Sequence, residues 1–131
     1  MTREGFAEYA LRDEIKAAIR FAQQRAMYDT DPSAGNCYSF AWDSNGFGPQ
    51  KNGIGAGFAN YLGPGGVVAL SGDYAGITLS PGSGIIYFDG LGNALKNNSC
   101  SGAASATTLT ISSGSNTLTL NVWPTGYVQT P

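Results

Sequence analysis

The charges and glycines of this 131-residue chain are distributed unevenly, and this asymmetry constrains the fold more than any single motif does. Residues 1–25 hold nine of the sixteen charged residues, whereas eighteen of the nineteen glycines lie at or after Gly35. A charged, glycine-poor segment favours a helix, while a segment rich in Gly, Ser and Thr favours strands joined by turns. The sequence therefore predicts one α+β domain, with a helical part over residues 1–31 and a β-rich part over residues 32–131.

The first part predicts one amphipathic helix from Phe6 to Tyr28. Its small and aliphatic residues recur at spacings of three and four, the period of an apolar stripe on a helix. The charged side chains lie between them and are expected on a solvated face, and Pro32 with the residues before it ends the helix. Nothing in the stripe is long or apolar enough to span a membrane, which takes about 20 continuous apolar residues. We expect it to pack on an antiparallel sheet through Ala7, Leu11, Ile15, Ala18, Ile19, Ala22 and Ala26.

The second part predicts antiparallel strands, because it contains short runs of β-branched and aromatic residues bounded by Gly, Pro, Asn or Ser. In two of these runs, apolar residues alternate with hydroxyl residues on both sides of a turn at Ser113–Asn116, which predicts a hairpin with one apolar and one hydroxyl face. A second turn is expected at Asp89–Gly92. The expected strands are Cys37–Trp42, Val67–Leu70, Ile77–Leu79, Ile85–Phe88, Thr108–Ile111 and Thr117–Trp123.

The segment between Gly46 and Gly66 contains eight glycines in twenty-one residues, and we expect it to form a long surface loop or an irregular edge. It does not predict a nucleotide site. The run Gly53–Gly57 lacks the third glycine of a G-x-G-x-x-G motif, and no Gly-Lys-Ser/Thr triplet occurs in the chain. No helical pattern follows that could supply an N-terminal dipole for a phosphate.

The residue types available for catalysis are few. The chain contains no His, which excludes Ser-His-Asp and Cys-His mechanisms and every metal site with a His ligand. The calcium-loop spacing that starts at Asp29 lacks its Gly and Glu, and neither S-x-x-K nor G-x-S-x-G occurs. The sequence predicts a protein that is not an enzyme, with no cofactor, metal or small-molecule substrate. Beyond the helix, the carboxylates are expected to be turn or cap residues: Asp29, Asp31, Asp43, Asp73 and Asp89.

Cys37 and Cys100 are the only cysteines. They could form a disulfide, remain buried free thiols, or contribute half of a metal site. Without a C-x-x-C spacing or a His, a metal would have too few soft ligands. A bridge closing so long a loop would stabilise the fold by about 4 kcal/mol in the chain-entropy model. The disulfide is therefore favoured, and it implies an oxidising compartment.

The helical run Leu11–Met27, the break after it, the Phe88–Gly92 segment and the terminal Val122–Val128 segment resemble the minor pilins and pseudopilins of the type IV pilin-like superfamily. The most similar groups are the H-type pseudopilins of type II secretion and the FimT-like minor pilins. The helix end Ala22–Met27 and the following Cys-Tyr pair are also similar to a minor pilin of the mannose-sensitive haemagglutinin pilus. The resemblance covers the whole chain loosely, and its specific part is the helix.

This resemblance implies a type IV pilin-like globular domain whose N-terminal helix packs against other major and minor pilins. Family members begin with an apolar stem that anchors them in the inner membrane, so residues 1–31 would be the C-terminal half of the helix in a truncated form. The subunit would be periplasmic before assembly in a Gram-negative bacterium and would then join a pilus or pseudopilus at the cell surface.

Nucleic-acid binding is not expected, although some FimT-like members bind DNA through arginines near a terminal Gly-Arg-Val. The matching triplet here is Gly126-Tyr127-Val128, and no basic residue follows Lys96. The formal net charge of −2 also argues against a partner with a phosphate backbone.

Two functions follow as predictions. The first is a non-catalytic minor pilin that helps to initiate or modify a type IV pilus or a type II secretion pseudopilus, with a role in adhesion. The alternative is a secreted carbohydrate- or surface-binding adhesin domain, which would use aromatic residues in its loops, namely Trp42, Phe47, Phe58 and Tyr61.

Overall fold

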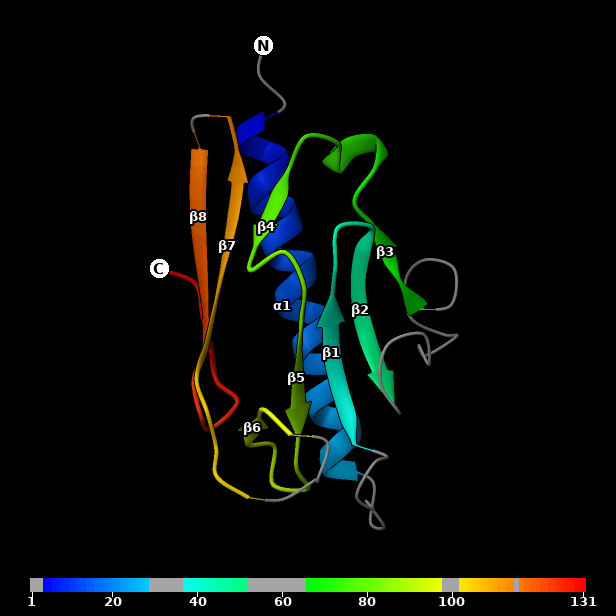
Figure 1. The fold of residues 1–131 in the computed structure, drawn as a ribbon, viewed down its shortest axis with the longest axis vertical. Coiled ribbons are helices and arrows are strands. Elements are labelled where there is room, and N and C mark those ends of the chain that lie inside the picture. Colours follow the sequence, from blue (N-terminus) through cyan, green and yellow to red (C-terminus); the bar gives the residue numbers. More distant parts are fainter. Residues whose placement is uncertain (1–3, 29–36, 52–65, 98–101, 115) are drawn as a thin grey trace.

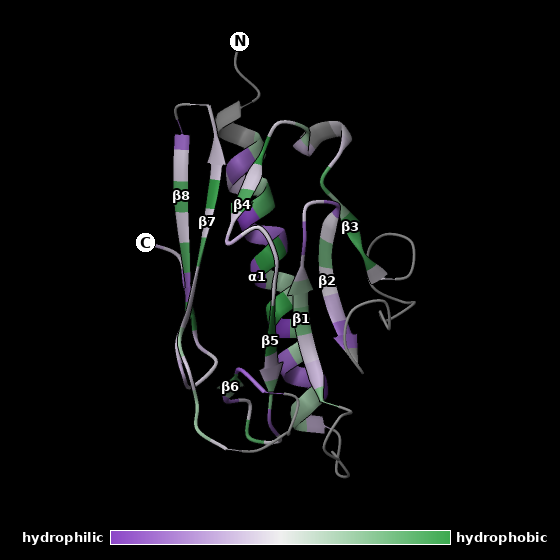
Figure 2. Ribbon diagram, viewed as in Figure 1, coloured by the Kyte–Doolittle hydropathy of each residue, from purple (hydrophilic) through white to green (hydrophobic). Residues whose placement is uncertain are grey.

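One long helix packs along two antiparallel sheets in the computed structural model, which describes residues 4–28, 37–51, 66–97, 102–114 and 116–131 (Figure 1). Helix α1 spans Glu4–Tyr28, so it begins two residues before the predicted start and ends at the predicted residue. The apolar stripe of α1 faces the sheets. Along the helix ribbon, hydrophobic segments alternate with hydrophilic ones (Figure 2). The α+β layout predicted from the sequence is confirmed.

The strands form a five-stranded sheet and a four-stranded sheet. The strand order in the first sheet is β3-β2-β1-β5-β6. A short 3-10 helix, η2 (Gly72–Tyr74), follows β3 in the chain. The order in the second is β4-β7-β8-β9. The strand bounds are β1 Tyr38–Trp42, β2 Gly46–Lys51, β3 Val68–Ala69, β4 Thr78–Ser80, β5 Gly84–Phe88, β6 Ala94–Leu95, β7 Thr107–Ser113, β8 Asn116–Val122 and β9 Val128–Gln129.

The predicted hairpin is present as β7 and β8. Leu109 pairs with Leu120 and Ile111 with Leu118, so the apolar residues share one face of the pair. Gly114 in the turn has a φ of 53°, a conformation that glycine adopts without steric cost. The second predicted turn is also confirmed, because the N–H of Gly92 donates to the carbonyl of Asp89 at 3.0 Å.

The expectation of a loop or irregular edge is wrong for Gly46–Lys51, which forms the inner strand β2 between β1 and β3. Glycine is needed here because the neighbouring backbone lies close. A Cβ on Gly46 would overlap the carbonyl oxygen of Val68, and one on Gly48 would overlap that of Gly66. Residues 52–65 of the same predicted loop lie outside the described residues.

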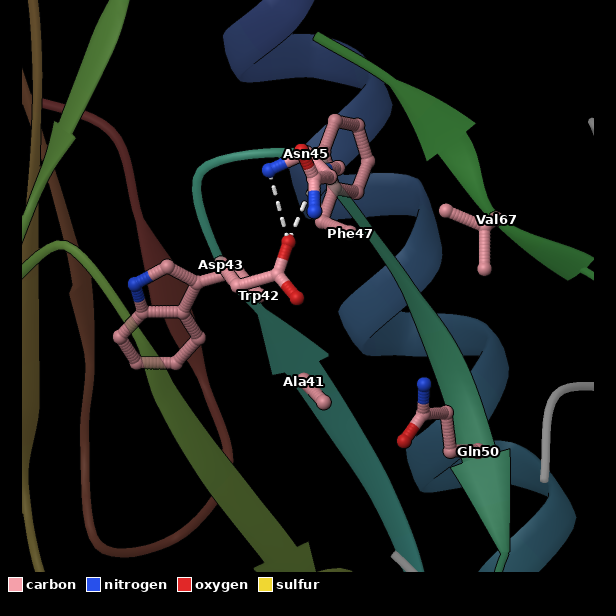
Figure 3. A pocket seen from close by; sticks show the side chains of 8 residues that line it. Ala41, Trp42, Asp43, Asn45, Phe47, Gln50 and Val67 are labelled. Carbon is pink, nitrogen blue, oxygen red and sulfur yellow. Dashed lines mark hydrogen bonds between the residues drawn. The ribbon is translucent and has the colours of Figure 1, made fainter. Parts of the chain in front are cut away.

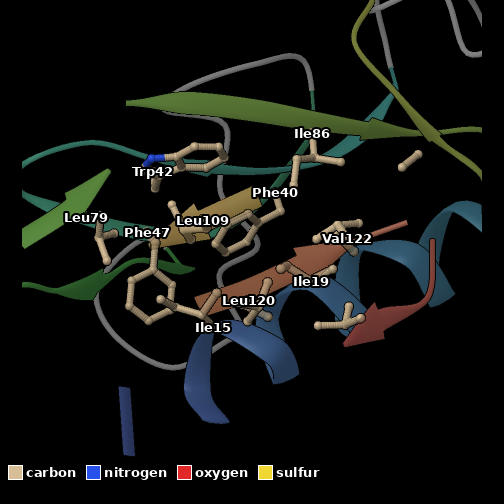
Figure 4. Close-up of a cluster of buried hydrophobic side chains, with 14 of the residues drawn as sticks. Ile15, Ile19, Phe40, Trp42, Phe47, Leu79, Ile86, Leu109, Leu120 and Val122 are labelled. Carbon is tan, nitrogen blue, oxygen red and sulfur yellow. The ribbon is translucent and has the colours of Figure 1, made fainter. Parts of the chain in front are cut away.

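A single hydrophobic cluster joins the helix to both sheets (Figure 4). Ile15 and Ile19 from α1 meet side chains of both sheets, among them Leu120 of β8. The ring centroid of Phe40 lies 5.8 Å from that of Trp42 and 5.9 Å from that of Phe47. Burying this cluster is the main source of stability available to the fold.

Candidate functional surfaces

The apolar stripe of α1 is occupied by the domain's own sheets. Five residues of the stripe have no exposed surface: Leu11, Ile15, Ala18, Ile19 and Ala22. Ala26 is 2% exposed, and Ala7 is partly buried against the same cluster. A partner that packs on this helix must therefore use its opposite side. We call that side the exposed helix face; it comprises Tyr9, Asp13, Ala17, Arg20 and Gln24.

Glu8 is an exception to the predicted separation of charged and apolar residues. It lies three residues before Leu11 and seven before Ile15, which places it in the apolar stripe, and it is only 1% exposed. Neither of its carboxylate oxygens has a hydrogen-bond partner among the described residues. The sequence does not predict this burial, because charged side chains are expected on the solvated side of the helix.

We expect Glu8→Met to stabilise the domain by about 1–3 kcal/mol, because it removes a buried carboxylate that has no hydrogen-bond partner within the described part of the chain. Glu14 provides the matched control, since its Oε2 accepts a hydrogen bond from the Tyr74 hydroxyl at 2.8 Å. Glu14→Met should therefore destabilise the domain by about 1 kcal/mol. Urea unfolding of both variants measures the difference, and a loss of stability in Glu8→Met would show that the carboxylate has a favourable partner.

Trp42 and Phe47 do not lie in surface loops, contrary to the adhesin prediction. Trp42 is the last residue of β1 and Phe47 is the second residue of β2, and they are 3% and 1% exposed. The Trp42 indole N–H donates to the carbonyl of Pro81 at 2.7 Å, and its ring lies against Gly84. Their side chains face the core because they occupy the inward positions of two paired strands. Phe58 and Tyr61, the other two predicted aromatics, lie outside the described residues.

A small pocket opens where β1, β2 and Val67 meet (Figure 3). Its volume is about 150 Å³, roughly enough for one small ring. The lining of the pocket is mostly apolar. The indole of Trp42 points away from the pocket (Figure 3). The Gln50 side chain, 4% exposed, brings into the lining an amide oxygen that has no hydrogen-bond partner among the described residues. Such a pocket can hold a small group but supplies no pair of groups for acid–base catalysis.

The described aspartates include two that shape turns, as predicted. Oδ1 of Asp43 accepts from the N–H groups of Asn45 and Gly46 at 2.8 and 3.1 Å, and Oδ1 of Asp89 accepts from those of Leu91 and Asn93 at 3.0 and 2.8 Å. Such bonds fix a turn by replacing backbone partners. Asp29 and Asp31 lie outside the described residues. In the part of the chain that is described, no three His, Cys, Asp or Glu side chains gather into a metal site.

Cys37 is buried and is bonded in a disulfide. Its sulfur is therefore neither a free thiol nor a metal ligand, which removes two of the three roles left open for it. Cys100, the predicted partner, lies outside the described residues.

The outward side of the four-stranded sheet is a second candidate surface. The residues between the buried positions of β7 and β8 carry hydroxyl or amide groups, as the alternation predicted. The neighbouring strands β4 and β9 extend the same chemistry. We call this surface the hydroxyl face; it comprises Thr78, Ser80, Thr108, Thr110, Ser112, Thr117, Thr119, Asn121 and Gln129. The sequence predicted its existence but gave it no role.

Comparisons with protein-family models, curated proteins and solved structures find no match to this chain. Within the described residues, no helix has both the length and the hydrophobicity to cross a bilayer. Candidate functions rest on the two surfaces defined above.

Proposed function

We propose that this chain is the globular domain of a minor pilin or pseudopilin. It is a non-catalytic subunit that co-assembles with other pilins to initiate or modify a type IV pilus or a type II secretion pseudopilus, and it contributes to adhesion. The main support is the position of α1, which is the first element of the described chain and runs along both sheets (Figure 1). The resemblance of Leu11–Met27 to the superfamily adds to this support.

The two sides of α1 suit two tasks. Its buried stripe fixes the helix to both sheets, so a force or contact on the helix is transmitted to the whole domain. The exposed helix face carries both an acidic and a basic residue, Asp13 and Arg20. Side chains of both signs allow one subunit to pack against a different surface of the next, and repeated heterologous contacts of this kind generate helical filaments.

The bonded state of Cys37 agrees with the proposed location. Disulfides persist in oxidising compartments, including the bacterial periplasm. We propose that the subunit is held at the inner membrane by a stem that precedes the described helix, resides in the periplasm, and then enters the filament. The adhesin alternative has lost the support of Trp42 and Phe47, because both rings are buried.

The experiment restores the full-length precursor to a deletion strain and counts surface pili by electron microscopy. We expect the native gene to restore pili and Arg20→Glu, on the exposed helix face, to reduce their number by about tenfold. Lys96→Glu is the matched charge reversal, because Lys96 is also exposed but lies away from the helix face; it should behave as wild type. Equal piliation with and without the gene would refute the proposal, and thermal melts of both purified variants control for folding.

A further inference from the structure

The hydroxyl face is continuous across four strands and uncharged. Thr108 pairs with Asn121, Thr110 with Thr119, and Ser112 with Thr117 across β7 and β8. On one side, Thr78 and Ser80 of β4 extend the face, and on the other Gln129 of β9 does so. Each of these side chains offers a hydrogen-bond donor, an acceptor or both, and none is ionisable.

Two exposed aromatic residues lie at the β8–β9 end of this face. Trp123 is 47% exposed and Tyr127 is 59% exposed. Their neighbours Val122 and Val128 are buried, so the alternation of side chains along the strands places both aromatics on the outer side. The N–H of Trp123 donates to the carbonyl of Tyr127 at 2.8 Å, which makes them a directly opposed pair across the turn.

A row of hydrogen bonds holds the Trp123 ring in place. Its indole N–H donates to Oε1 of Gln129 at 3.2 Å, and the same oxygen accepts from Nδ2 of Asn121 at 3.4 Å. Oδ1 of Asn121 in turn accepts from the Thr108 hydroxyl at 3.0 Å. The polar atom of the indole is thus already bonded, while nearly half of the surface of the residue is left to solvent. A ring fixed in this way loses little entropy when a ligand stacks on it.

The row continues at its other end into an open groove between the two sheets. The groove has a volume of about 410 Å³ and is lined by Thr108 together with Ser83 and Lys96. Lys96 is the one basic side chain among the described residues that line this groove. The surface from groove to aromatic pair therefore combines hydroxyl groups, carboxamides and two aromatic rings, with one cation, Lys96, inside the groove.

We propose that this surface, the hydroxyl face with Trp123 and Tyr127, binds a neutral carbohydrate. A sugar ring has an apolar side of C–H groups that stacks on an aromatic ring, and its hydroxyl groups match the donors and acceptors of Thr, Asn and Gln side chains. A charged partner gains little here, because the face carries no ionisable side chain for it to pair with. The site is independent of the helix contacts proposed for assembly, since it lies on the side of the four-stranded sheet away from α1 (Figure 1).

Affinity electrophoresis of the purified domain tests this inference, with dextran, starch and hydroxyethyl cellulose as neutral probes and alginate as an acidic probe. A neutral glycan array extends the panel. We expect retardation by at least one neutral polysaccharide that does not change with salt, because no ion pair contributes. Trp123→Ala and Tyr127→Ala should each weaken the binding by about tenfold or more.

Tyr9→Ala is the matched control, because Tyr9 is 54% exposed but lies on α1, and it should bind as wild type. Thr119→Val keeps the shape of a side chain on the face while removing its hydroxyl, and should weaken binding several-fold without unfolding the domain. No binding to any neutral probe or array glycan would overturn the inference. So would binding to alginate alone that high salt abolishes, or an equal loss in Tyr9→Ala.

Discussion

Gly126→Ala is expected to destabilise the domain by about 2–5 kcal/mol. Two effects contribute. Gly126 has a φ of 86°, where an alanine costs about 1–2 kcal/mol. In addition, its Cβ would overlap the carbonyl oxygen of Gly92 and the side-chain amide of Gln23, which adds about 1–3 kcal/mol of overpacking. Gln23 cannot simply turn away, because its Nε2 donates to the Gly92 carbonyl at 2.9 Å.

Gly76→Ala separates the two effects. Gly76 also has a φ of 86°, but a Cβ there would meet nothing within 4 Å. It should therefore lose only the conformational contribution, about 1–2 kcal/mol. Chemical denaturation of both variants gives the comparison. Equal losses would mean that the contact of Gly126 with Gly92 and Gln23 does not form in solution.

Leu120→Ala is expected to destabilise the domain by about 2–5 kcal/mol. Leu120 is fully buried on β8, where it belongs to the cluster shared by α1 and both sheets (Figure 4). Removing its side chain loses buried apolar surface and leaves a cavity that the surrounding strands and helix can fill only partly. The midpoint of thermal unfolding should fall by several degrees for each kcal/mol lost in a domain of this size.

Leu91→Ala is the same chemical change at a site that is 80% exposed. It should alter stability by less than about 0.5 kcal/mol, as surface substitutions usually do. A loss in Leu120→Ala no larger than that in Leu91→Ala would contradict the packing of β8 against α1.

The contact at Gly126 also bears on the carbohydrate inference. The turn that carries Trp123 and Tyr127 is closed by a bond from the N–H of Gly126 to the carbonyl of Trp123 at 2.8 Å. The carbonyl of Pro124, in the same turn, accepts from the N–H of Ala94. The aromatic pair is therefore supported from beneath by the end of α1 and by the segment before β6. Trp123→Ala leaves this support intact, so it tests binding without removing the turn.

The elements that could be predicted are those whose pattern is local. The helix follows from apolar residues at spacings of three and four, and the β7–β8 hairpin from strict alternation around a short turn. Strand β2 could not be predicted in the same way. Its glycines carry no side-chain pattern, and they are extended because β1 and β3 lie on either side. Strands β6 and β9 are two residues long and show no periodicity at all.

Of the candidate surfaces too, only the parts that follow from a local sequence pattern could be predicted. The hydroxyl face was visible in the alternation of Thr with Leu, because each strand of the hairpin shows its two sides in sequence. The aromatic residues were not. Trp42 and Trp123 both end a strand-forming run, yet one is 3% exposed and the other 47% exposed. The burial of Glu8 was equally hidden, because its spacing places it in the apolar stripe while its charge favours the solvated side of the helix.

The sequence by itself determined the helix, the two-faced hairpin and the absence of any histidine-based chemistry, since each depends on residue type and spacing alone. Only the tertiary structure decided which aromatic rings reach solvent and which side of α1 remains open. Those properties depend on what packs across from a residue, and its packing partners can lie far away in the chain. Trp42 is covered near Gly84 of β5, whereas Trp123 is held by Gln129 with its ring facing outward.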